Sequence, residues 1–490
     1  MVSKPSNNLF IVLCLTLSAA LFFLGTGLSP FWLLTWLAPI PVLWISSRLS
    51  SGEAFLIALS VYALGGLNEW SYSHTVLPTW LVVFILLGTS CLFAIAVVLF
   101  RSRIQKEKLW QAALIFPAFW VAAEYIASVL SVHGTFGNIS YSQMDFLPIV
   151  QIASVTGIWG ISFCIFLFAA AAASVLGAGS IRAKAPLTAA VLVFLACIFG
   201  FGMWRLSTTP KDSPTVKVAL IASDEAENMH ASTPEQVLTI SRRYAEQMKP
   251  LTAQGIQLFV LPEHSGPVTD ASQPGFDAFF GQLAKQSGAH VAIGIDRSTS
   301  TATWNQQRLY SPDGSLTASY NKHHLLRHLE DETPGTERSV VTEPSGKWGL
   351  QICKDMDFPR LSRQYAQDGI GLLIVPAWDF VQDGWLHGRM AVLRGVESGF
   401  SIARSAKLGI LTATDDRGRV LAERNTLAAP FATVVATIPV RHDATIYARF
   451  GDWFAWLNIA ALVILLIMPF TASRQNAKFA AQKADESGRA

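Results

Sequence analysis

The chain has 490 residues, of which 51% are hydrophobic and only 14% are charged, and its mean hydropathy is +0.38. An ordinary soluble domain is about a quarter charged, so this composition favours a membrane protein. The formal net charge of +3 is too small to indicate a nucleic-acid partner, and the sequence contains no basic stripe or nucleic-acid-binding motif.

The apolar residues are unevenly distributed along the chain. Residues 1–210 are mostly apolar, 211–445 have the composition of a soluble domain, 446–472 are again apolar, and 473–490 form a polar tail. We therefore predict a membrane domain of seven transmembrane helices, an extracytoplasmic domain with a core of its own, an eighth transmembrane helix and a cytoplasmic tail.

Eight apolar runs approach the roughly 20 residues that a membrane-spanning helix needs. A bilayer permits only a backbone that is hydrogen-bonded within itself, so each run is predicted to be a helix. The first run lacks a clear small-x-small cleavage site before Pro30, and we interpret it as a span rather than a signal peptide. The runs cover residues 9–27, 31–47, 54–72, 77–100, 109–130, 149–176, 186–204 and 453–470.

Lysine and arginine gather on one side of this eight-span arrangement, whereas alternate loops such as 25–30 and 131–148 contain neither. Short loops rich in these residues stay in the cytoplasm. We therefore predict a multi-pass protein of a bacterial inner (cytoplasmic) membrane, with residues 211–445 in the periplasm. The basic residues concerned are Lys4, Arg48, Arg101, Arg103, Lys106, Lys108, Arg182, Lys184, Arg474, Lys478, Lys483 and Arg489.

Between Thr215 and His442, short β-type runs alternate with amphipathic stretches, which predicts an α+β layered domain. Thr233 is a predicted helix N-cap, and the sequence Pro-Asp-Gly at 312–314 predicts a hairpin turn. The predicted strands are 216–222, 257–261, 290–295, 304–310, 316–320, 348–353, 371–375, 400–406 and 409–413, and the predicted helices are 234–248, 276–286, 359–367 and 385–398.

One cysteine, Cys353, lies in this domain, and the other four lie inside apolar runs, so no disulfide framework is available. A single thiol in an oxidising compartment is a liability unless it is buried or used. Cys353 follows a predicted strand and precedes a helix opened by Pro359, and the N-terminus of that helix is predicted to lower the pKa of the thiol.

Two further reactive side chains also follow predicted strands, Glu263 in Leu-Pro-Glu-His-Ser and Lys322 in Tyr-Asn-Lys-His-His. Taken singly, a glutamate there is usually a cap or an ion-pair partner, a lysine a solvated charge, and a cysteine a packing residue. Together with Cys353 they form one chemical unit. The carboxylate can accept the proton of the thiol, and the ammonium can neutralise the oxyanion that forms when a thiolate attacks a carbonyl.

The order Glu263, Lys322, Cys353 resembles the catalytic triad of the nitrilase superfamily, and this resemblance implies an αββα sandwich. Four other segments resemble the apolipoprotein N-acyltransferases of that superfamily, so the likeness covers nearly the whole chain. It implies an enzyme without metal or cofactor that transfers an acyl chain from a phospholipid, through a cysteine thioester, to a lipidated apolipoprotein. The four segments are 116–125, 139–143, 152–163 and 390–399.

The sequence departs from that family around the nucleophile. Lys354 and Asp355 follow Cys353 where the family typically has Tyr-Glu, and they are predicted to support the triad. Glu330 corresponds by spacing to the family's glutamate beyond the lysine, but His328-Leu329 replaces the usual Phe-Gly before it. The stretch between the lysine and the cysteine is also shorter than in the family, which puts the handling of lipid substrates in question.

Two other functions are compatible with parts of the sequence. A membrane-tethered amidase or nitrile hydrolase would use the same three residues with water as second nucleophile, although one membrane anchor would then suffice. A transporter or scaffold with a decayed domain is a non-enzymatic alternative, for which Glu124 inside an apolar run could mark a polar pathway. The complete set of three reactive residues argues against the decayed domain.

Overall fold

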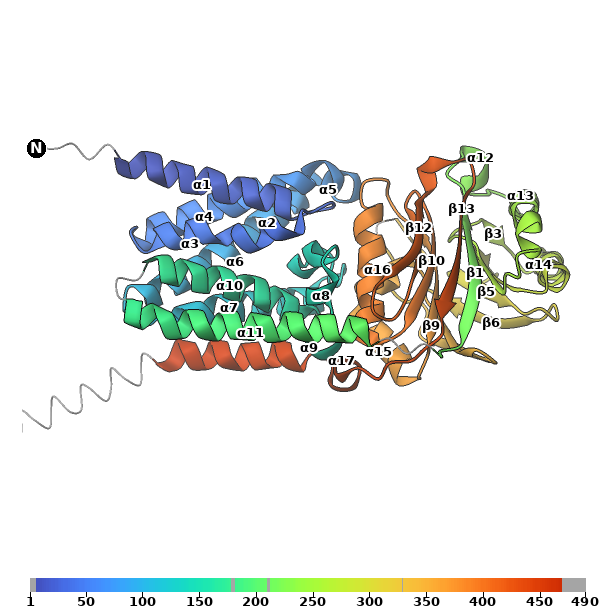
Figure 1. Cartoon of the computed structure of the whole chain (residues 1–490). Coiled ribbons are helices and arrows are strands. Elements are labelled where there is room, and N and C mark those ends of the chain that lie inside the picture. Colours follow the sequence, from blue (N-terminus) through green and yellow to red (C-terminus); the bar gives the residue numbers. More distant parts are fainter. Residues whose placement is uncertain (1–5, 178–180, 209–211, 328, 469–490) are drawn as a thin grey trace, which may run out of the picture. The chain divides into compact units, whose positions relative to one another are not determined.

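The computed structural model describes residues 6–177, 181–208, 212–327 and 329–468, which divide into two compact units (Figure 1). Unit 1 comprises the described parts of Met1–Leu130, Trp159–Cys197 and Asp452–Ala490, and unit 2 comprises those of Ser131–Ile158 and Ile198–Gly451. The predicted tail 473–490, the basic residues within it, Lys4 and His328 lie outside the described residues.

Unit 1 is helical. Its helix α1 packs against α4, α4 against α6, and α6 against α7. The helices are α1 (Ser6–Gly25), α2 (Trp32–Leu37), α3 (Pro39–Ser46), α4 (Ser51–Gly65), η1 (Gly66–Glu69), α5 (Trp70–Val76), α6 (Thr79–Ile104), α7 (Leu109–Leu130), α10 (Ile158–Gly177), the first part of α11 (Ile181–Ser207), and a final helix, Trp453–Met468.

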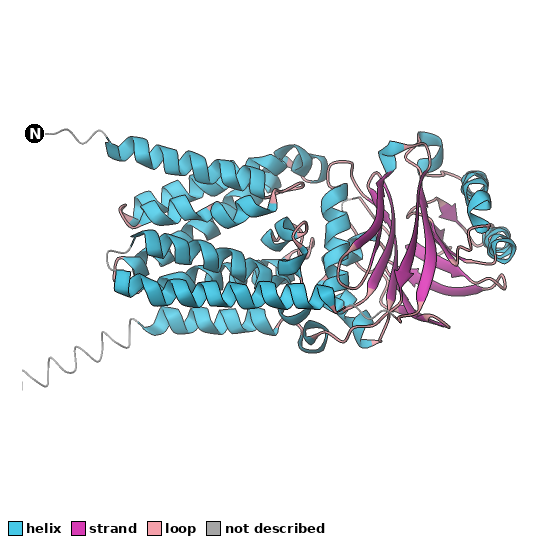
Figure 2. Ribbon diagram, in the orientation of Figure 1, coloured by secondary structure: helices cyan, strands magenta, loops and turns pink. Residues whose placement is uncertain are grey.

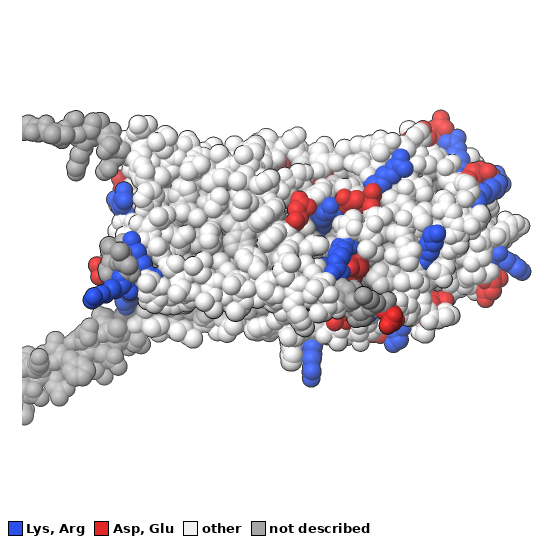
Figure 3. Space-filling view, viewed as in Figure 1, with Lys and Arg blue, Asp and Glu red and all other residues white. Residues whose placement is uncertain are grey.

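Aromatic rings pack together inside unit 1, and large apolar side chains, both aliphatic and aromatic, are exposed on its helices. Phe22, Tyr62, Phe93 and Trp120 contact one another at ring-centroid separations of 4.9–6.0 Å. Large apolar side chains such as Leu130 are exposed on the helices. On the face drawn in Figure 3, the helices of unit 1 show little charge along most of their length, and the charged side chains gather near their ends. An apolar exterior around a packed core is what a lipid environment requires.

Five described helices are long and apolar enough to cross a membrane, judged by length and composition: Asn8–Gly25, Thr79–Ile104, Leu109–Leu130, Ile158–Gly177 and Lys184–Ser207. The runs predicted at 31–47 and 453–470 form the shorter helices Trp32–Ser46 and Trp453–Met468. The run at 54–72 is divided, because α4 ends at Gly65 and is followed by η1 and α5. A membrane region is therefore supported, and the number of eight spans stays a prediction.

The span predicted at 149–176 is wrong at its beginning. Residues before Gly157 form two short helices, α8 (Leu147–Val150) and α9 (Ala153–Thr156), and the long helix α10 begins only at Ile158. Gly157 interrupts the run because it has φ +67° and lies against the ring of Tyr447, where a Cβ would come within 2.5 Å of a ring carbon. The Glu397 carboxylate accepts the backbone N–H of Ile158 at 2.7 Å and so caps α10.

Unit 2 contains two β-sheets (Figure 2). The first has the order β13-β1-β2-β4-β5-β6, with β3 paired to β4, and the second has the order β12-β11-β10-β9-β8-β7. The strands of the first are β1 (Thr215–Ala222), β2 (Leu258–Val260), β3 (Pro267–Val268), β4 (His290–Ser298), β5 (Thr303–Tyr310), β6 (Leu316–Asn321) and β13 (Ala432–Pro439); those of the second are β7 (Ser339–Glu343), β8 (Gly346–Leu350), β9 (Leu372–Trp378), β10 (Ser401–Lys407), β11 (Ile410–Thr414) and β12 (Val420–Asn425).

The two sheets pack face to face, and helices cover their outer faces. Strand β1 shows why, since Val218 and Leu220 join the core between the sheets, whereas Ala219 and Ile221 join the core under α13 and α14. A third core lies under the helices of the second sheet. The helices are η2 (Ile139–Gln143), α12 (Ala226–Met229), α13 (Pro234–Thr252), α14 (Gln273–Ser287), η3 (Cys353–Asp357), α15 (Pro359–Gln367), α16 (Gly384–Ser398), η4 (Thr426–Ala428) and α17 (Ile446–Phe450).

This αββα sandwich confirms the predicted fold of the soluble domain. The predicted strands and helices all have counterparts, and the Thr233 hydroxyl caps α13 by accepting the N–H of Gln236. The predicted strand 348–353 is too long, because β8 ends at Leu350 and Cys353 begins the 3-10 helix η3. Strands β3, β7, β12 and β13 were not predicted. Strand β3 has only two residues, and β12, at the sheet edge, is mostly exposed and shows no alternation of apolar and polar residues.

Candidate active site

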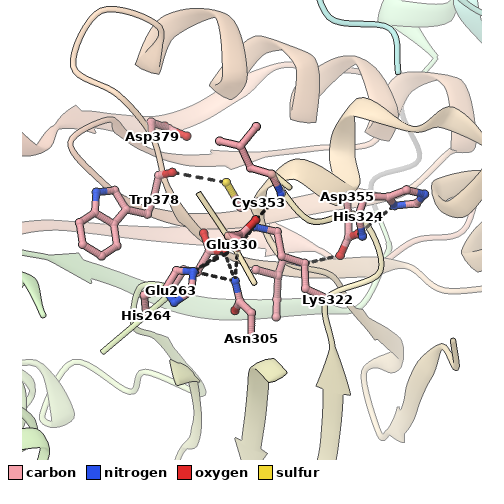
Figure 4. A network of polar contacts seen from close by, with 12 residues as sticks. Glu263, His264, Asn305, Lys322, His324, Glu330, Cys353, Asp355, Trp378 and Asp379 are labelled. Carbon is pink, nitrogen blue, oxygen red and sulfur yellow. Dashed lines mark hydrogen bonds and ion pairs between the residues drawn. The ribbon is translucent and has the colours of Figure 1, made fainter. Parts of the chain in front are cut away.

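Glu263 and Lys322 meet at the ends of two strands of the first sheet, where both side chains are buried (Figure 4). Lys322 follows β6 directly, and its Nζ donates to Glu263 Oε1 at 2.9 Å. The amide of Asn305, on β5, donates to the same oxygen at 2.6 Å. A buried carboxylate thus has a buried ammonium and an amide as partners, which compensates the cost of desolvating the charge.

Glu330 is a second carboxylate on the same ammonium. Lys322 Nζ lies 2.7 Å from its Oε1 and 3.0 Å from its Oε2, and the backbone N–H of Leu326 donates to Oε2 at 2.5 Å. Burial by itself would lower the pKa of Lys322, but the charges of Glu263 and Glu330 hold that pKa well above its usual value. Burial would raise the pKa of Glu330, but Lys322 and His264 hold it well below its usual value. Both groups are therefore charged at neutral pH.

Cys353 is the first residue of η3, and its φ of +41° turns the chain sharply after β8. The side chain is half-buried, and its Sγ lies 3.5 Å from the carbonyl oxygen of Trp378, at the end of β9. Figure 4 shows it beside Glu263 and Lys322. Burial and then the charge of Glu263 raise the pKa of Cys353 well above its usual value, against the opposing effect of Lys322.

The predicted lowering of the Cys353 pKa by a helix N-terminus is therefore wrong. The α-helix opened by Pro359 begins six positions further along, after the 3-10 turn η3, and burial beside a carboxylate outweighs any helix dipole. The resting group is a thiol. It can become a nucleophile only by passing its proton to a neighbouring base during the reaction.

Asp355 joins the nucleophile turn to the segment that carries Lys322. Its Oδ2 accepts the hydroxyl of Tyr320 at 2.7 Å and the N–H of Ile352 at 3.2 Å. Its Oδ1 accepts the backbone N–H groups of His323 at 3.2 Å and His324 at 2.9 Å. The carboxylate is fully buried, so it fixes the position of Lys322 relative to Cys353 through hydrogen bonds on both sides.

Lys354 points away from the triad. Its Nζ donates to Asp357 Oδ2 at 3.1 Å and lies 3.2 Å from Nδ1 of His133. Thr135, two residues beyond His133, donates its N–H and its hydroxyl to the carbonyl oxygen of Asp357 at 3.0 and 2.8 Å. The lysine side chain therefore anchors the loop that begins at Ser131 to the nucleophile turn.

Two groups of side chains could in principle surround a cation, because their ligand atoms lie within 4.8 Å of one another. Both groups contain His264, together with either Glu263 and Glu330 or Asp296 and Glu332. The two nitrogens of His264 already face carboxylates, and Lys322 already lies between Glu263 and Glu330. We therefore assign no metal ion to either group.

Sequence reasoning brought Glu263, Lys322, Glu330, Cys353 and Asp355 to one place, and the structure puts them there. It missed other members of the site, three of which lie on the strands β4, β5 and β9, because the alternation of apolar residues in a strand does not indicate which of its other side chains reach a site. The missed residues are His264, Asp296, Asn305 and Trp378. For His264 a signal existed, since it directly follows Glu263.

An αββα sandwich with a glutamate, a lysine and a cysteine gathered at strand ends defines a member of the nitrilase superfamily. The family model of the carbon-nitrogen hydrolases matches residues 209–450, and that of the apolipoprotein N-acyltransferase N-terminal domain matches residues 18–171. The chain thus belongs to the apolipoprotein N-acyltransferase family, and the resemblance noted in the sequence is confirmed.

Relatives with that name match along most of the chain. The apolipoprotein N-acyltransferase of Geobacter metallireducens is 26% identical, over 92% of this chain and 93% of its own length. That of Haemophilus ducreyi is 24% identical, over 92% and 95%, and that of Thermotoga maritima is 24% identical, over 81% and 80%. Both halves of the chain therefore have counterparts in these relatives.

Two solved structures resemble unit 2 more distantly. Nit3 of Saccharomyces cerevisiae, a member of branch 10 of the nitrilase superfamily, is 22% identical, with a TM-score of 0.40 over 46% of this chain and 91% of its own. The NitN amidase from Neterenkonia sp. AN1 is 19% identical, with a TM-score of 0.41 over 50% and 99%.

Proposed function

We propose that the protein is an N-acyltransferase that moves an acyl chain from a phospholipid, through a thioester on Cys353, to the N-terminal α-amine of a diacylglyceryl-cysteine lipoprotein. The observation that carries the proposal is the meeting of Glu263, Lys322 and Cys353 at the strand ends. The full-length likeness to proteins named apolipoprotein N-acyltransferase supports the choice of substrates.

In the first half-reaction Glu263 accepts the thiol proton of Cys353 while the sulfur attacks the ester carbonyl of a phospholipid. Lys322 and the backbone N–H of Lys354 stabilise the oxyanion, an effect worth about 3–4 kcal/mol for one such donor. The ester C–O bond then breaks, and Glu263 returns the proton to the departing alkoxide. Lysophospholipid leaves, and the acyl group remains on sulfur.

In the second half-reaction the α-amine of the lipoprotein attacks the thioester. Glu263 accepts a proton from the attacking amine and passes it to the departing sulfur, which restores the thiol of Cys353 and releases the amide. Glu330 keeps Lys322 in place, and Asp355 keeps the nucleophile turn in register with it. The reaction uses no metal or cofactor.

The membrane arrangement forms part of the proposal. Both substrates carry acyl chains, so a catalyst built into a membrane meets them where they already reside. We propose that residues 1–210 and 446–472 are the membrane domain, with eight spans, and that the domain 211–445 faces the periplasm from the inner membrane. The apolar helices support a membrane location, and the distribution of basic residues supports the orientation.

The test is mass spectrometry of the full-length protein mixed with phospholipid. An acyl adduct should appear on the peptide containing Cys353 and should be absent from Cys353→Ala. The adduct should then persist in buffer and disappear when a diacylglyceryl-cysteine peptide is added, because a transferase must admit the lipidated amine to its thioester and exclude water.

Three outcomes would count against the proposal. Acylation retained in Cys353→Ala would exclude the thioester. A discharge rate that does not respond to the lipopeptide, together with rapid turnover of a soluble amide, would indicate a membrane-tethered amidase instead. Discharge to buffer as fast as to lipopeptide would exclude a transferase even without amidase activity.

A further inference from the structure

His264 has a backbone conformation that is uncommon for its residue type. It directly follows Glu263, and its φ of +50° lies in the left-handed region. Such a conformation is unfavourable for a non-glycine residue, and it persists where the surroundings impose it. Here it turns the imidazole back beneath Glu263, toward β4 and the segment that carries Glu330 (Figure 4).

Both ring nitrogens of His264 face carboxylates. Nδ1 pairs with Asp296 Oδ1 on β4, and Nε2 lies 3.2 Å from Glu330 Oε1. Glu263 Oε1 is 3.7 Å from Nε2. The amide nitrogen of Asn305 is 2.9 Å from Nε2, but it also donates to Glu263 Oε1 at 2.6 Å and to Glu330 Oε1 at 2.9 Å, so its two hydrogens have carboxylate acceptors. A hydrogen bond to a carboxylate from each nitrogen requires both to carry hydrogen, which is the imidazolium form.

The charges around the ring favour that form. Burial by itself would lower the pKa of His264, but the hydrogen bonds to Asp296 and Glu330, and then the charges of Asp296 and Glu263, raise it to about 10. The positive and negative groups that face the ring from the surrounding elements are Glu263, Asp296, Glu330, Glu332, Lys322, His230 and Lys407, the last of which donates to the carbonyl oxygen of His264 at 2.9 Å.

A second cation changes what Lys322 is free to do. Without His264, the single ammonium of Lys322 faces two carboxylates, Glu263 and Glu330, and must stay between them. When the His264 imidazolium donates to Glu330, that carboxylate has a cationic partner other than Lys322. Lys322 can then turn toward the oxyanion, and the carboxylate of Glu263 still has the His264 ring within 3.7 Å.

We propose that His264 is a positioning residue of the triad, a fixed cation held between Asp296 and Glu330 that places a second positive charge beside the base Glu263 and releases Lys322 for the oxyanion. The inference rests on the proposed function for the role of Lys322. The protonation of His264 and its effect on Cys353 can be measured without any lipid.

The first experiment measures alkylation of Cys353 by iodoacetamide in the full-length protein between about pH 4 and 9, followed on the Cys353 peptide by mass spectrometry. The alkylation rate should fall on the acid side of the profile, and the midpoint pH of that fall should be higher by about one unit or more in His264→Gln than in the wild type. The reason is the loss of a positive charge beside the base. His264→Lys should restore the wild-type position. The matched control, His442→Gln at an exposed histidine, should leave the profile unchanged.

A merely structural role of His264 predicts a slower rate at every pH without a shift, and that result would overturn the proposal. A second measurement needs no variant. Deuterium exchange at the ring C2–H of His264 in the wild-type protein should titrate well above pH 8, whereas an ordinary histidine has a pKa near 6.5. A midpoint for His264 near or below 6.5 would show a neutral imidazole and would also overturn it.

The same variants separate this inference from the proposed function. Acyl-adduct formation from phospholipid should show the same pH shift in His264→Gln. If the wild-type protein forms no adduct but the alkylation profile shifts as expected, the proposed acyl donor is wrong and the role of His264 stands.

Discussion

The two sides of the nucleophile turn are built in different ways. On one side Glu263, Lys322 and Glu330 contact one another through charged side chains. On the other side the Asp355 carboxylate accepts three backbone N–H groups and one hydroxyl, and its Oδ1 lies 3.0 Å from Nδ1 of the His324 ring. The first arrangement can change its protonation during a reaction, whereas the second holds its geometry only while its charge is constant. Proton transfer and positioning are therefore assigned to separate carboxylates.

The comparison predicts a separation of phenotypes. Substitutions on the triad side should slow chemistry more than they reduce stability, and substitutions on the Asp355 side should do the reverse. Lys322 is the exception, because it touches two buried carboxylates and so contributes to both.

Glu263→Gln should have the largest kinetic effect. Glutamine keeps the size of the side chain and an oxygen for Lys322, but it cannot accept the proton of Cys353. Thioester formation should slow by about 10²–10⁴-fold, the usual range for loss of a general base, with little change in melting temperature. The measurement is single-turnover adduct formation, with the exposed Glu227→Gln as control. A rate within a few fold of wild type would exclude Glu263 as the base.

Lys322→Ala should slow both half-reactions by about 10²–10³-fold, because the oxyanion loses its charged donor in each. It should also cost about 3–5 kcal/mol of unfolding free energy, since Glu263 and Glu330 then face each other without an ammonium. The two measurements are the rate of acyl-adduct formation from phospholipid and the rate of adduct discharge to lipopeptide, each divided by the amount of folded enzyme. Lys347→Ala, at an exposed lysine, is the control. An effect on only one half-reaction would contradict the assigned role.

Asp355→Asn should reverse the pattern seen for Glu263→Gln. The asparagine amide would direct hydrogens at groups that are themselves donors, so stability should fall by about 2–3 kcal/mol, whereas acylation by the folded fraction should fall only about tenfold. Denaturant unfolding and adduct formation measure the two quantities, with the exposed Asp212→Asn as control. Unchanged stability with abolished chemistry would place Asp355 on the proton-transfer side.

The smallest effect concerns Glu330 and acid stability. Its pKa is lower in the folded protein than its usual value near 4.3, so its contribution to stability is present above that value and is lost as pH falls through the folded pKa. Between about pH 5 and 3, the melting temperature of Glu330→Gln should therefore fall less steeply than that of the wild type. Glu246→Gln, at an exposed ion pair, should fall in parallel with the wild type, and a parallel fall for Glu330→Gln would contradict the expectation.

The sequence was least informative where backbone turns decide the chemistry. The left-handed residues Cys353 and His264 follow strands, and nothing in a pattern of apolar residues indicates that either departs from the strand conformation. The pKa of Cys353 was predicted in the wrong direction for this reason, because its sign depends on burial and on Glu263, some 90 positions earlier in the chain. The predicted span 149–176 begins too early, because Gly157 counts as an apolar residue in the sequence but interrupts the helix with its positive φ.

The amino-acid sequence was sufficient to predict the layered fold of residues 211–445, since alternating apolar residues indicate which face of each strand is buried. It was also sufficient to single out Glu263, Lys322 and Cys353, because each follows a predicted strand, although the first two follow strands of the first sheet and Cys353 follows β8 of the second. It also determined that a large part of the chain is too apolar to be soluble. Three arrangements became known only from the folded structure. Asp355, rather than Glu330, joins the nucleophile turn to the segment that carries Lys322. Lys354 turns away from the triad, and His264 lies between Asp296 and Glu330. These contacts join residues far apart in the chain, and their charges depend on burial, which no local pattern contains.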